Sequence, residues 1–209
     1  TVIRSTGGIT VGAWFFPDWK AGGHGATTLT KAIAESVNTY FYTIGGGYQQ
    51  FSGLGLDRLV RALRSAGLGS PTGIDVPGEA AGLVPTQAWK LATRGEPWYI
   101  GDTYHLAIGQ GDLLVTPLQV ANWTALIAND GTLFRPRLAM GSVGPDGLAA
   151  KGKVEVIRRV FSGGGDLALV RSGMRATVTV GSARALADAL VPIAGKTGTA
   201  EWSDRRPPH

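Results

Sequence analysis

Glycine and proline are distributed along this sequence in a way that limits the length of its regular elements. The 209 residues include 32 glycines and 11 prolines, and these follow no collagen-like period. They cluster between segments with a periodic apolar pattern, so they predict many turns and long connections. With 44% hydrophobic and 17% charged residues, the chain is nevertheless expected to bury a core and to fold as one globular domain.

An apolar pattern typical of a helix begins at Leu29 and is interrupted once. Apolar residues recur at steps of three and four as far as Ile44, which predicts a helix that buries one face. Ser36-Val37-Asn38 interrupts this pattern with two residues that are unfavourable in a helix interior. We expect a kink or a short break there, where polar side chains can point into a cleft. A helix cap followed by a solvated residue would give the same letters.

A second notable segment is Gly195-Lys196-Thr197-Gly198-Thr199-Ala200. The residues before it are apolar and partly β-branched, so residues 191–200 are predicted to form one strand. Alternation along a strand places Lys196 and Gly198 on one face and Thr197 and Thr199 on the other. A cation beside hydroxyls suits a carboxylate, and Gly198 lets a ligand's backbone lie close. An ordinary strand with a surface lysine is the alternative.

Three further segments give local predictions of helices. Asp57 is expected to cap a helix that follows it. Thr116-Pro117-Leu118-Gln119 combines a capping box with a proline at the first helical position, which predicts a helix that runs to about Asn129. The buried face of a later helix is expected to consist of Leu167, Val170 and Met174.

Charge and composition exclude several classes of function. The net charge is +5, but the basic residues are scattered and form no stripe with aromatic residues, so no nucleic acid is expected as a partner. The absence of cysteine excludes disulfides and cysteine catalysis. No run of eighteen apolar residues occurs, so no membrane span is expected within these residues. Asp18 and His24 are candidate metal ligands without a third ligand nearby, so no metal or other cofactor is expected.

Ser36-Val37-Asn38 and Lys196-Thr197-Gly198, read together, resemble the second and third motifs of the serine acyltransferases that include penicillin-binding proteins and class A β-lactamases. The sequence between them resembles the transpeptidase domain of class B penicillin-binding proteins, over nearly the whole chain. The region around Trp19-Lys20 and Gly23-His24-Gly25 looks like the elongation, rod-shape type. The intervening motifs that carry the resemblance are Gly101-Asp102-Thr103, Gly109-Gln110-Gly111, Thr116-Pro117-Leu118-Gln119, Ala121-Asn122 and Ile127-Ala128-Asn129.

The resemblance implies an α/β fold of the α+β type, in which an antiparallel sheet is flanked by helices. It also implies a reaction, the cross-linking of peptidoglycan stem peptides that end in D-Ala-D-Ala through a serine acyl-enzyme. Lys196, Thr197 and Thr199 would bind the substrate carboxylate, and the backbone N–H of Thr199 would donate to the oxyanion. Ser36 would relay a proton and Asn38 would bind the substrate's amide.

One departure from the family pattern concerns the nucleophile. No Ser-x-x-Lys occurs in the 209 residues, so this motif is expected before Thr1. Thr28-Leu29-Thr30-Lys31 has a similar spacing but lies where the family has the helix that leads into the second motif. The strands expected after Lys196 are also missing, so residues 1–209 are interpreted as a partial transpeptidase domain, truncated at both ends.

Some rod-shape members bind zinc through residues placed like Asp18 and His24, together with a cysteine at the position that Val37 occupies here. Because valine cannot ligate a metal, no zinc is expected.

These expectations define an enzyme and one alternative. The full-length protein is expected to be a D-Ala-D-Ala transpeptidase on the outer face of the cell membrane, anchored by a segment outside this chain. Its expected partners are stem peptides, β-lactam antibiotics and a membrane glycosyltransferase of cell-wall synthesis. The alternative is a non-catalytic β-lactam-binding or scaffold module of the same fold. A β-lactamase fits less well, because more residues separate Asn38 from Lys196 in the sequence than in such compact enzymes.

Overall fold

The computed structural model describes residues 1–147, 149–161 and 164–200. The chain forms two compact units, each assembled from separate stretches of sequence. Unit 1 contains Thr1–Leu59, Thr86–Gly111 and the chain from Ala168 onward, whereas unit 2 contains Val60–Pro85 and Asp112–Leu167. Both candidate motifs, at residues 36–38 and 196–198, therefore belong to unit 1.

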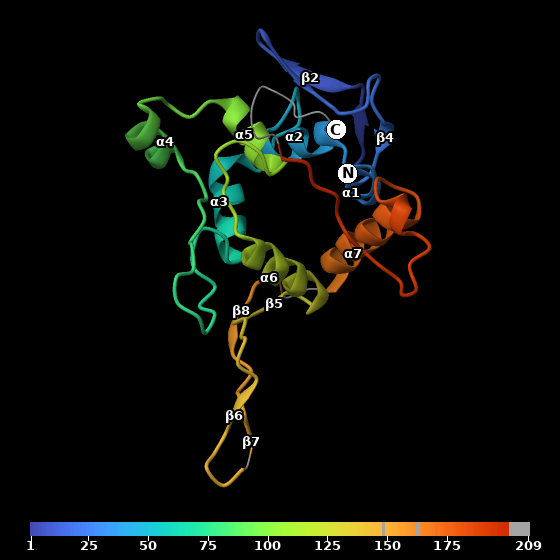
Figure 1. Ribbon diagram of the computed structural model, residues 1–209. Coiled ribbons are helices and arrows are strands. Elements are labelled where there is room, and N and C mark those ends of the chain that lie inside the picture. Colours follow the sequence, from blue (N-terminus) through green and yellow to red (C-terminus); the bar gives the residue numbers. More distant parts are fainter. Residues whose placement is uncertain (148, 162–163, 201–209) are drawn as a thin grey trace, which may run out of the picture. The chain divides into compact units, whose positions relative to one another are not determined.

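The elements are short, as the distribution of glycine predicts, and they follow one another in runs of strands and runs of helices (Figure 1). The helices are α1 (Leu29–Glu35), α2 (Asn38–Gly46), α3 (Gly55–Ser65), α4 (Gln87–Arg94), α5 (Ile100–Ala107), α6 (Pro117–Ala128), α7 (Gly164–Thr179) and the short 3₁₀ helix η1 (Arg184–Leu186). The strands are β1 (Ile3–Ser5), β2 (Gly8–Val11), β3 (Trp14–Pro17), β4 (Gly25–Thr27), β5 (Thr132–Phe134), β6 (Gly141–Val143), β7 (Ala149–Lys151) and β8 (Val156–Arg159).

All strands of the described residues pair in antiparallel fashion. They form four two-stranded sheets, β1 with β4, β2 with β3, β5 with β8, and β6 with β7. The mixture of helices and antiparallel strands agrees with the predicted α+β class. A single larger sheet is not formed by the part of the chain that the structure describes.

In unit 1, the predicted break between two helices is confirmed. α1 ends at Glu35 and α2 begins at Asn38, and Val37 between them is fully buried in a cluster with Ala32 and Tyr40. α2 packs closely against α5, because Gly46 leaves room for the ring of Tyr104. A Cβ at Gly46 would overlap with that ring, so a larger residue there would separate the two helices.

In unit 2, the predicted capping box is confirmed at the start of α6. The Thr116 side chain accepts a hydrogen bond from the backbone N–H of Gln119, and the Gln119 side chain accepts one from the N–H of Thr116. Gln119 is buried and its amide also donates to the carbonyls of Ser70 and Ala81, both at 2.8 Å. Gln119 thereby links the start of α6 to two loops of the same unit, and these contacts satisfy its buried amide.

Two predictions of helix detail need correction. α3 begins at Gly55, so Asp57 lies in its first turn and is not the cap; a carboxylate there still favours the positive end of the helix dipole. On α7, Leu167 is buried as predicted, but Val170 and Met174 are only half-buried. Gly173, Thr177 and Val178 are the buried residues of its later turns, because small residues allow close contact with α1.

The predicted strand over residues 191–200 is wrong. These residues adopt no regular secondary structure, and most of them are exposed. A strand requires a neighbouring strand that accepts and donates its backbone hydrogen bonds, and no other described segment pairs with residues 191–200 in that way.

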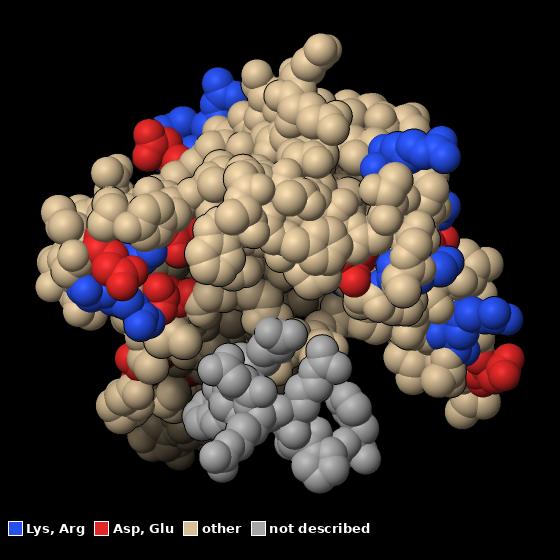
Figure 2. All heavy atoms as spheres, turned by 90° about the horizontal axis from the view of Figure 1, so that it is seen from above, with Lys and Arg blue, Asp and Glu red and all other residues tan. Residues whose placement is uncertain are grey.

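Charged side chains are mixed on the surface. On the face that Figure 2 shows, Lys and Arg lie in separate patches, several of them beside Asp or Glu. No continuous basic surface is visible on this face, in agreement with the scattered basic residues of the sequence.

Candidate functional site

Ser36 lies at the sharp turn between α1 and α2 in a left-handed backbone conformation. Its φ and ψ are 56° and 51°, which a residue with a Cβ adopts at a cost of about 1–2 kcal/mol. The turn ends α1, since the N–H of Ser36 donates to the carbonyl of Ala32. The next residue, Val37, is fully buried, whereas Ser36 is only half-buried.

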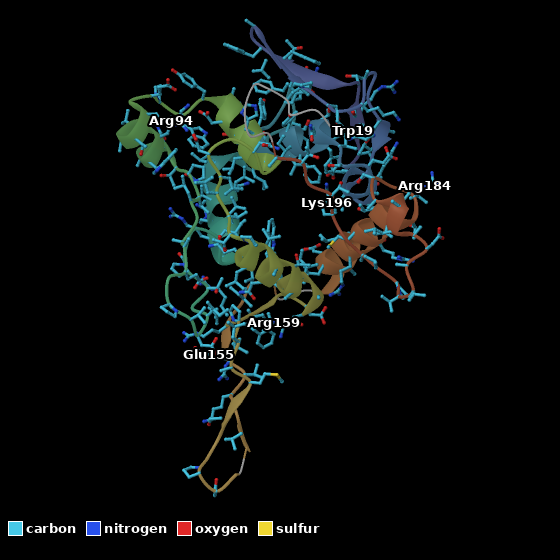
Figure 3. All side chains as sticks on the ribbon, viewed as in Figure 1. Trp19, Arg94, Glu155, Arg159, Arg184 and Lys196 are labelled. Carbon is cyan, nitrogen blue, oxygen red and sulfur yellow. The ribbon has the colours of Figure 1, made fainter. Side chains whose placement is uncertain are left out.

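Lys196 meets Ser36 across 160 positions of the sequence. The ammonium Nζ donates to Ser36 Oγ at 2.8 Å and to the carbonyl of Thr197 at 2.8 Å. Figure 3 labels Lys196 on the C-terminal segment of the described chain. The structure therefore brings together the two motifs that the sequence singled out, as a serine hydroxyl in contact with a lysine amine.

The environment of Lys196 shifts its pKa downward. Although much of the side chain is exposed, partial burial lowers the pKa of Lys196 below its ordinary value. Desolvation acts in this direction because it penalises the charged ammonium. The Ser36 hydroxyl, 2.8 Å from the Lys196 nitrogen, is within the distance that proton transfer requires.

Helix α7 holds the segment that carries Lys196. The backbone N–H of Gly195 donates to the carbonyl of Met174 at 3.0 Å, and the guanidinium of Arg175 donates to the carbonyl of Ile193 at 2.6 Å. α7 is tied to α1 in turn, because the hydroxyl of Thr177 donates to the carbonyl of Ile33 at 3.3 Å. The two candidate motifs are thus both anchored to the same pair of helices.

The remaining predicted residues of this segment differ in their contacts. The hydroxyl of Thr197 is 2.7 Å from that of Ser182, while the carbonyl of Thr199 accepts a hydrogen bond from the Gln110 side chain at 2.6 Å. A Cβ at Gly198 would meet nothing within 4 Å. No contact within the described residues therefore requires glycine there, and a close approach of a ligand to Gly198 stays a prediction.

Asn38 is the first residue of α2, and its side chain is only half-buried. Its amide nitrogen donates to the carbonyl of Pro17 at a long 3.4 Å, and among the described residues no donor to its amide oxygen is found. Thr28 is the N-cap of α1 and Lys31 donates to the carbonyl of His24 at 2.6 Å. Thr28 and Lys31 thus have structural roles, which agrees with the interpretation that their spacing is a coincidence.

Sequence reasoning missed the role of Asp18, which it treated only as a metal ligand. Asp18 is buried, and its carboxylate accepts hydrogen bonds from the backbone N–H groups of Asn38 and Thr39, at 3.2 and 3.1 Å. One sequence signal could have indicated this role, because Val37 precedes α2 and has no side chain that can cap a helix. A helix without its own cap needs acceptor partners from another segment.

Asp18, His24 and Glu35 lie together, but they do not fit a zinc site. His24 Nδ1 is 2.6 Å from Glu35 Oε2, and His24 Nε2 is 3.6 Å from Asp18 Oδ1. The Asp18 oxygens already accept several hydrogen bonds, and Val37 offers no ligand at the motif's middle position. Within the described residues, no group of three or more His, Cys, Asp and Glu is arranged to hold a metal.

No helix of the described residues is long and apolar enough to span a membrane.

Comparison with known proteins gives the context of this arrangement. The family model of the penicillin-binding protein transpeptidase domain matches residues 1–208. The peptidoglycan D,D-transpeptidase MrdA of Acinetobacter baumannii is 36% identical over 191 residues, which are 89% of this chain and 27% of that protein. The chain therefore spans only about a quarter of the length of this relative.

Solved structures show the same similarity. The chain matches Pseudomonas aeruginosa PBP2 in complex with WCK 5153 with a TM-score of 0.82 and 34% identity, over 97% of this chain and 45% of that one. It matches PBP2 in the complex of PBP2 and MreC from Helicobacter pylori with a TM-score of 0.81 and 36% identity, over 96% of this chain and 36% of that one. The predicted fold class and the predicted elongation type are thereby confirmed. The chain belongs to the family of penicillin-binding protein transpeptidase domains, among relatives of the PBP2/MrdA type.

Proposed function

We propose that the full-length protein is a peptidoglycan D,D-transpeptidase that cross-links stem peptides through a serine acyl-enzyme. The 2.8 Å contact between Lys196 Nζ and Ser36 Oγ carries this proposal. It joins a lysine of lowered pKa to a hydroxyl, as a proton relay for acyl transfer requires. The names of the relatives, which are D,D-transpeptidases, agree with it.

The chemistry assigns a role to each residue of the site. Acyl transfer from D-Ala-D-Ala needs a relay for the nucleophile's proton, a partner for the substrate amide and a cation for the terminal carboxylate. Ser36 serves as the relay and Asn38 binds the amide. Lys196 is the cation that stabilises the negative charge of the terminal carboxylate, and the hydroxyls of Thr197 and Thr199 bind the same group. Gly198 leaves space for the substrate's backbone.

These residues form one part of a complete active site. No Ser-x-x-Lys occurs in the 209 residues, so the nucleophile is supplied by a segment of the full-length protein outside them. Residues 1–209 are accordingly part of one transpeptidase domain. We place that domain on the outer side of the cell membrane, where its substrate is located, with an anchor elsewhere in the protein.

The proposed partners follow from the same reaction. β-Lactams are ligands because they imitate the D-Ala-D-Ala end of the stem peptide and acylate the nucleophilic serine that lies outside residues 1–209. Cross-linking acts on newly made glycan strands, which favours a membrane glycosyltransferase as a protein partner. A similar structure is described as a peptidoglycan synthase complex that coordinates polymerization and crosslinking, whereas the Helicobacter pylori relative is in complex with MreC.

Acylation of the full-length protein by a labelled penicillin tests the proposed function. Lys196→Ala is expected to slow acylation about ten- to a hundredfold, because a charge-assisted contact is worth about 1.5–3 kcal/mol. Lys31→Ala is the matched control, since Lys31 donates to the carbonyls of His24 and Ala26 in unit 1 and lies outside the site. Unchanged acylation in a folded Lys196→Ala protein would contradict the assignment. A parent protein that is never acylated would favour a scaffold instead.

A further inference from the structure

Two adjacent residues, Asp18 and Trp19, make hydrogen bonds to the backbone of the turn at Ser36. On one side of the turn, the indole N–H of Trp19 donates to the carbonyls of Glu35 and Ser36, at 2.9 and 3.1 Å. On the other side, Asp18 accepts from the first two N–H groups of α2, those of Asn38 and Thr39. The turn is therefore held at both of its ends by two adjacent residues.

Asp18 replaces the missing cap of α2. Its Oδ2 accepts from both the N–H and the hydroxyl of Thr39, at 3.1 and 2.8 Å, and from the hydroxyl of Ser5 at 3.2 Å. Its Oδ1 accepts from the N–H groups of Asn38 and Trp19, at 3.2 and 3.0 Å. A buried carboxylate at the N-terminus of a helix satisfies free donors and interacts favourably with the helix dipole.

Trp19, labelled in Figure 3, is 62% exposed although its indole N–H makes two hydrogen bonds. Burial of apolar surface therefore does not account for its position as well as its hydrogen bonds do. The carbonyls that it binds are at the end of α1, where helical partners are missing. Their fixation supports the left-handed conformation of Ser36, which costs about 1–2 kcal/mol in a residue other than glycine.

We propose that Asp18 and Trp19 are positioning residues, which hold the Ser36 hydroxyl toward Lys196 and the Asn38 side chain at the start of α2. The inference rests on the proposed function, because it assigns a purpose to the orientation of Ser36. Both residues act through the backbone of the turn. A small rotation of the turn would lengthen the 2.8 Å contact between Ser36 Oγ and Lys196 Nζ and weaken proton relay, because proton transfer depends steeply on this distance.

The test is a double-mutant cycle in the full-length protein, with the rate of acylation by a labelled penicillin as the readout. Trp19→Phe keeps an aromatic ring beside His24 but removes the N–H donor. It is expected to slow acylation about three- to tenfold, or about 0.7–1.4 kcal/mol. Trp14→Phe is the matched control, since Trp14 is a more exposed tryptophan, 75%, on β3, and it is expected to leave the rate unchanged.

The second arm of the cycle introduces Trp19→Phe into a Ser36→Ala background. If Trp19 acts through Ser36, its replacement changes the rate less than about twofold there, since coupled residues are not additive. Equal slowing in both backgrounds, or no slowing in either, would overturn the inference. The rate is expressed per active site by titration with the penicillin, and a loss of active sites at unchanged rate would also overturn it. If Ser36→Ala itself acylates like the parent, the proposed function fails, whatever Trp19→Phe does.

Discussion

The buried Lys90 forms an ion pair with the half-buried Asp102, and disruption of this pair should lower the stability of the protein. Lys90 is 5% exposed, and its Nζ lies 2.7 Å from Asp102 Oδ2 and 3.6 Å from Glu96 Oε2. Burial alone would lower the pKa of Lys90, but the hydrogen bond and charge of Asp102 raise it above the ordinary value. The pair therefore stabilises the folded chain at neutral pH, and this contribution is lost as the pH rises through the raised pKa of Lys90.

The perturbation is Asp102→Asn, which keeps an oxygen for the N–H of Tyr99 but removes the charge opposite Lys90. Loss of one partner of a buried pair costs about 3–5 kcal/mol. The more distant Glu96 remains and Asp102 is partly solvated, so we expect the free energy of unfolding to fall by about 2–3 kcal/mol. Urea unfolding of the full-length protein, followed by tryptophan fluorescence, measures the change in the free energy of unfolding.

A second variant separates the charge effect from other losses. Lys90→Met removes the buried ammonium, so adding it to Asp102→Asn is expected to restore most of the lost stability, because an apolar side chain can replace a buried pair at little cost. Two results would refute the view that Lys90 depends on Asp102. One is that the stability losses of the two single substitutions add up in the double variant, and the other is a loss below about 1 kcal/mol for Asp102→Asn.

Three further predictions concern packing, pH and metal. A Cβ at Gly173 would lie 2.8 Å from Ile33 Cβ, so Gly173→Ala should destabilise the protein by about 1–3 kcal/mol. A Cβ at Gly165 on the same helix would meet nothing within 4 Å, so Gly165→Ala should be neutral or slightly stabilising. Thermal unfolding compares the two variants, and equal effects would contradict the close packing at Gly173. The pKa of Lys196 is lowered from 10.5, so the acylation rate should fall as the pH rises through this lowered pKa and the ammonium loses its proton. Lys196→Arg should move this fall in rate to higher pH, since arginine stays charged. The same pH dependence in both proteins would speak against a role of the Lys196 charge. Val37 offers no metal ligand, so elemental analysis of dialysed protein should find no stoichiometric zinc, and one zinc per chain would reverse this expectation.

The parts of the fold that the sequence predicted well are those with local causes. The break at residues 36–38 and the capping box at Thr116–Gln119 are determined by neighbouring side chains that satisfy or disrupt nearby backbone groups. Residues 191–200 were predicted wrongly, because a strand depends on a partner that local sequence does not specify. The role of Asp18 was missed for a similar reason, since its partners are about twenty positions away and are backbone groups.

The left-handed conformation of Ser36 sets two requirements on one position that no single residue meets fully. The backbone alone would be most stable with glycine, by about 1 kcal/mol, because glycine adopts this conformation without steric cost. The proposed proton relay needs the hydroxyl, which glycine lacks. If the proposed relay were not needed, folding stability alone would favour glycine at position 36, so the residue at this turn would indicate whether a related chain keeps the relay.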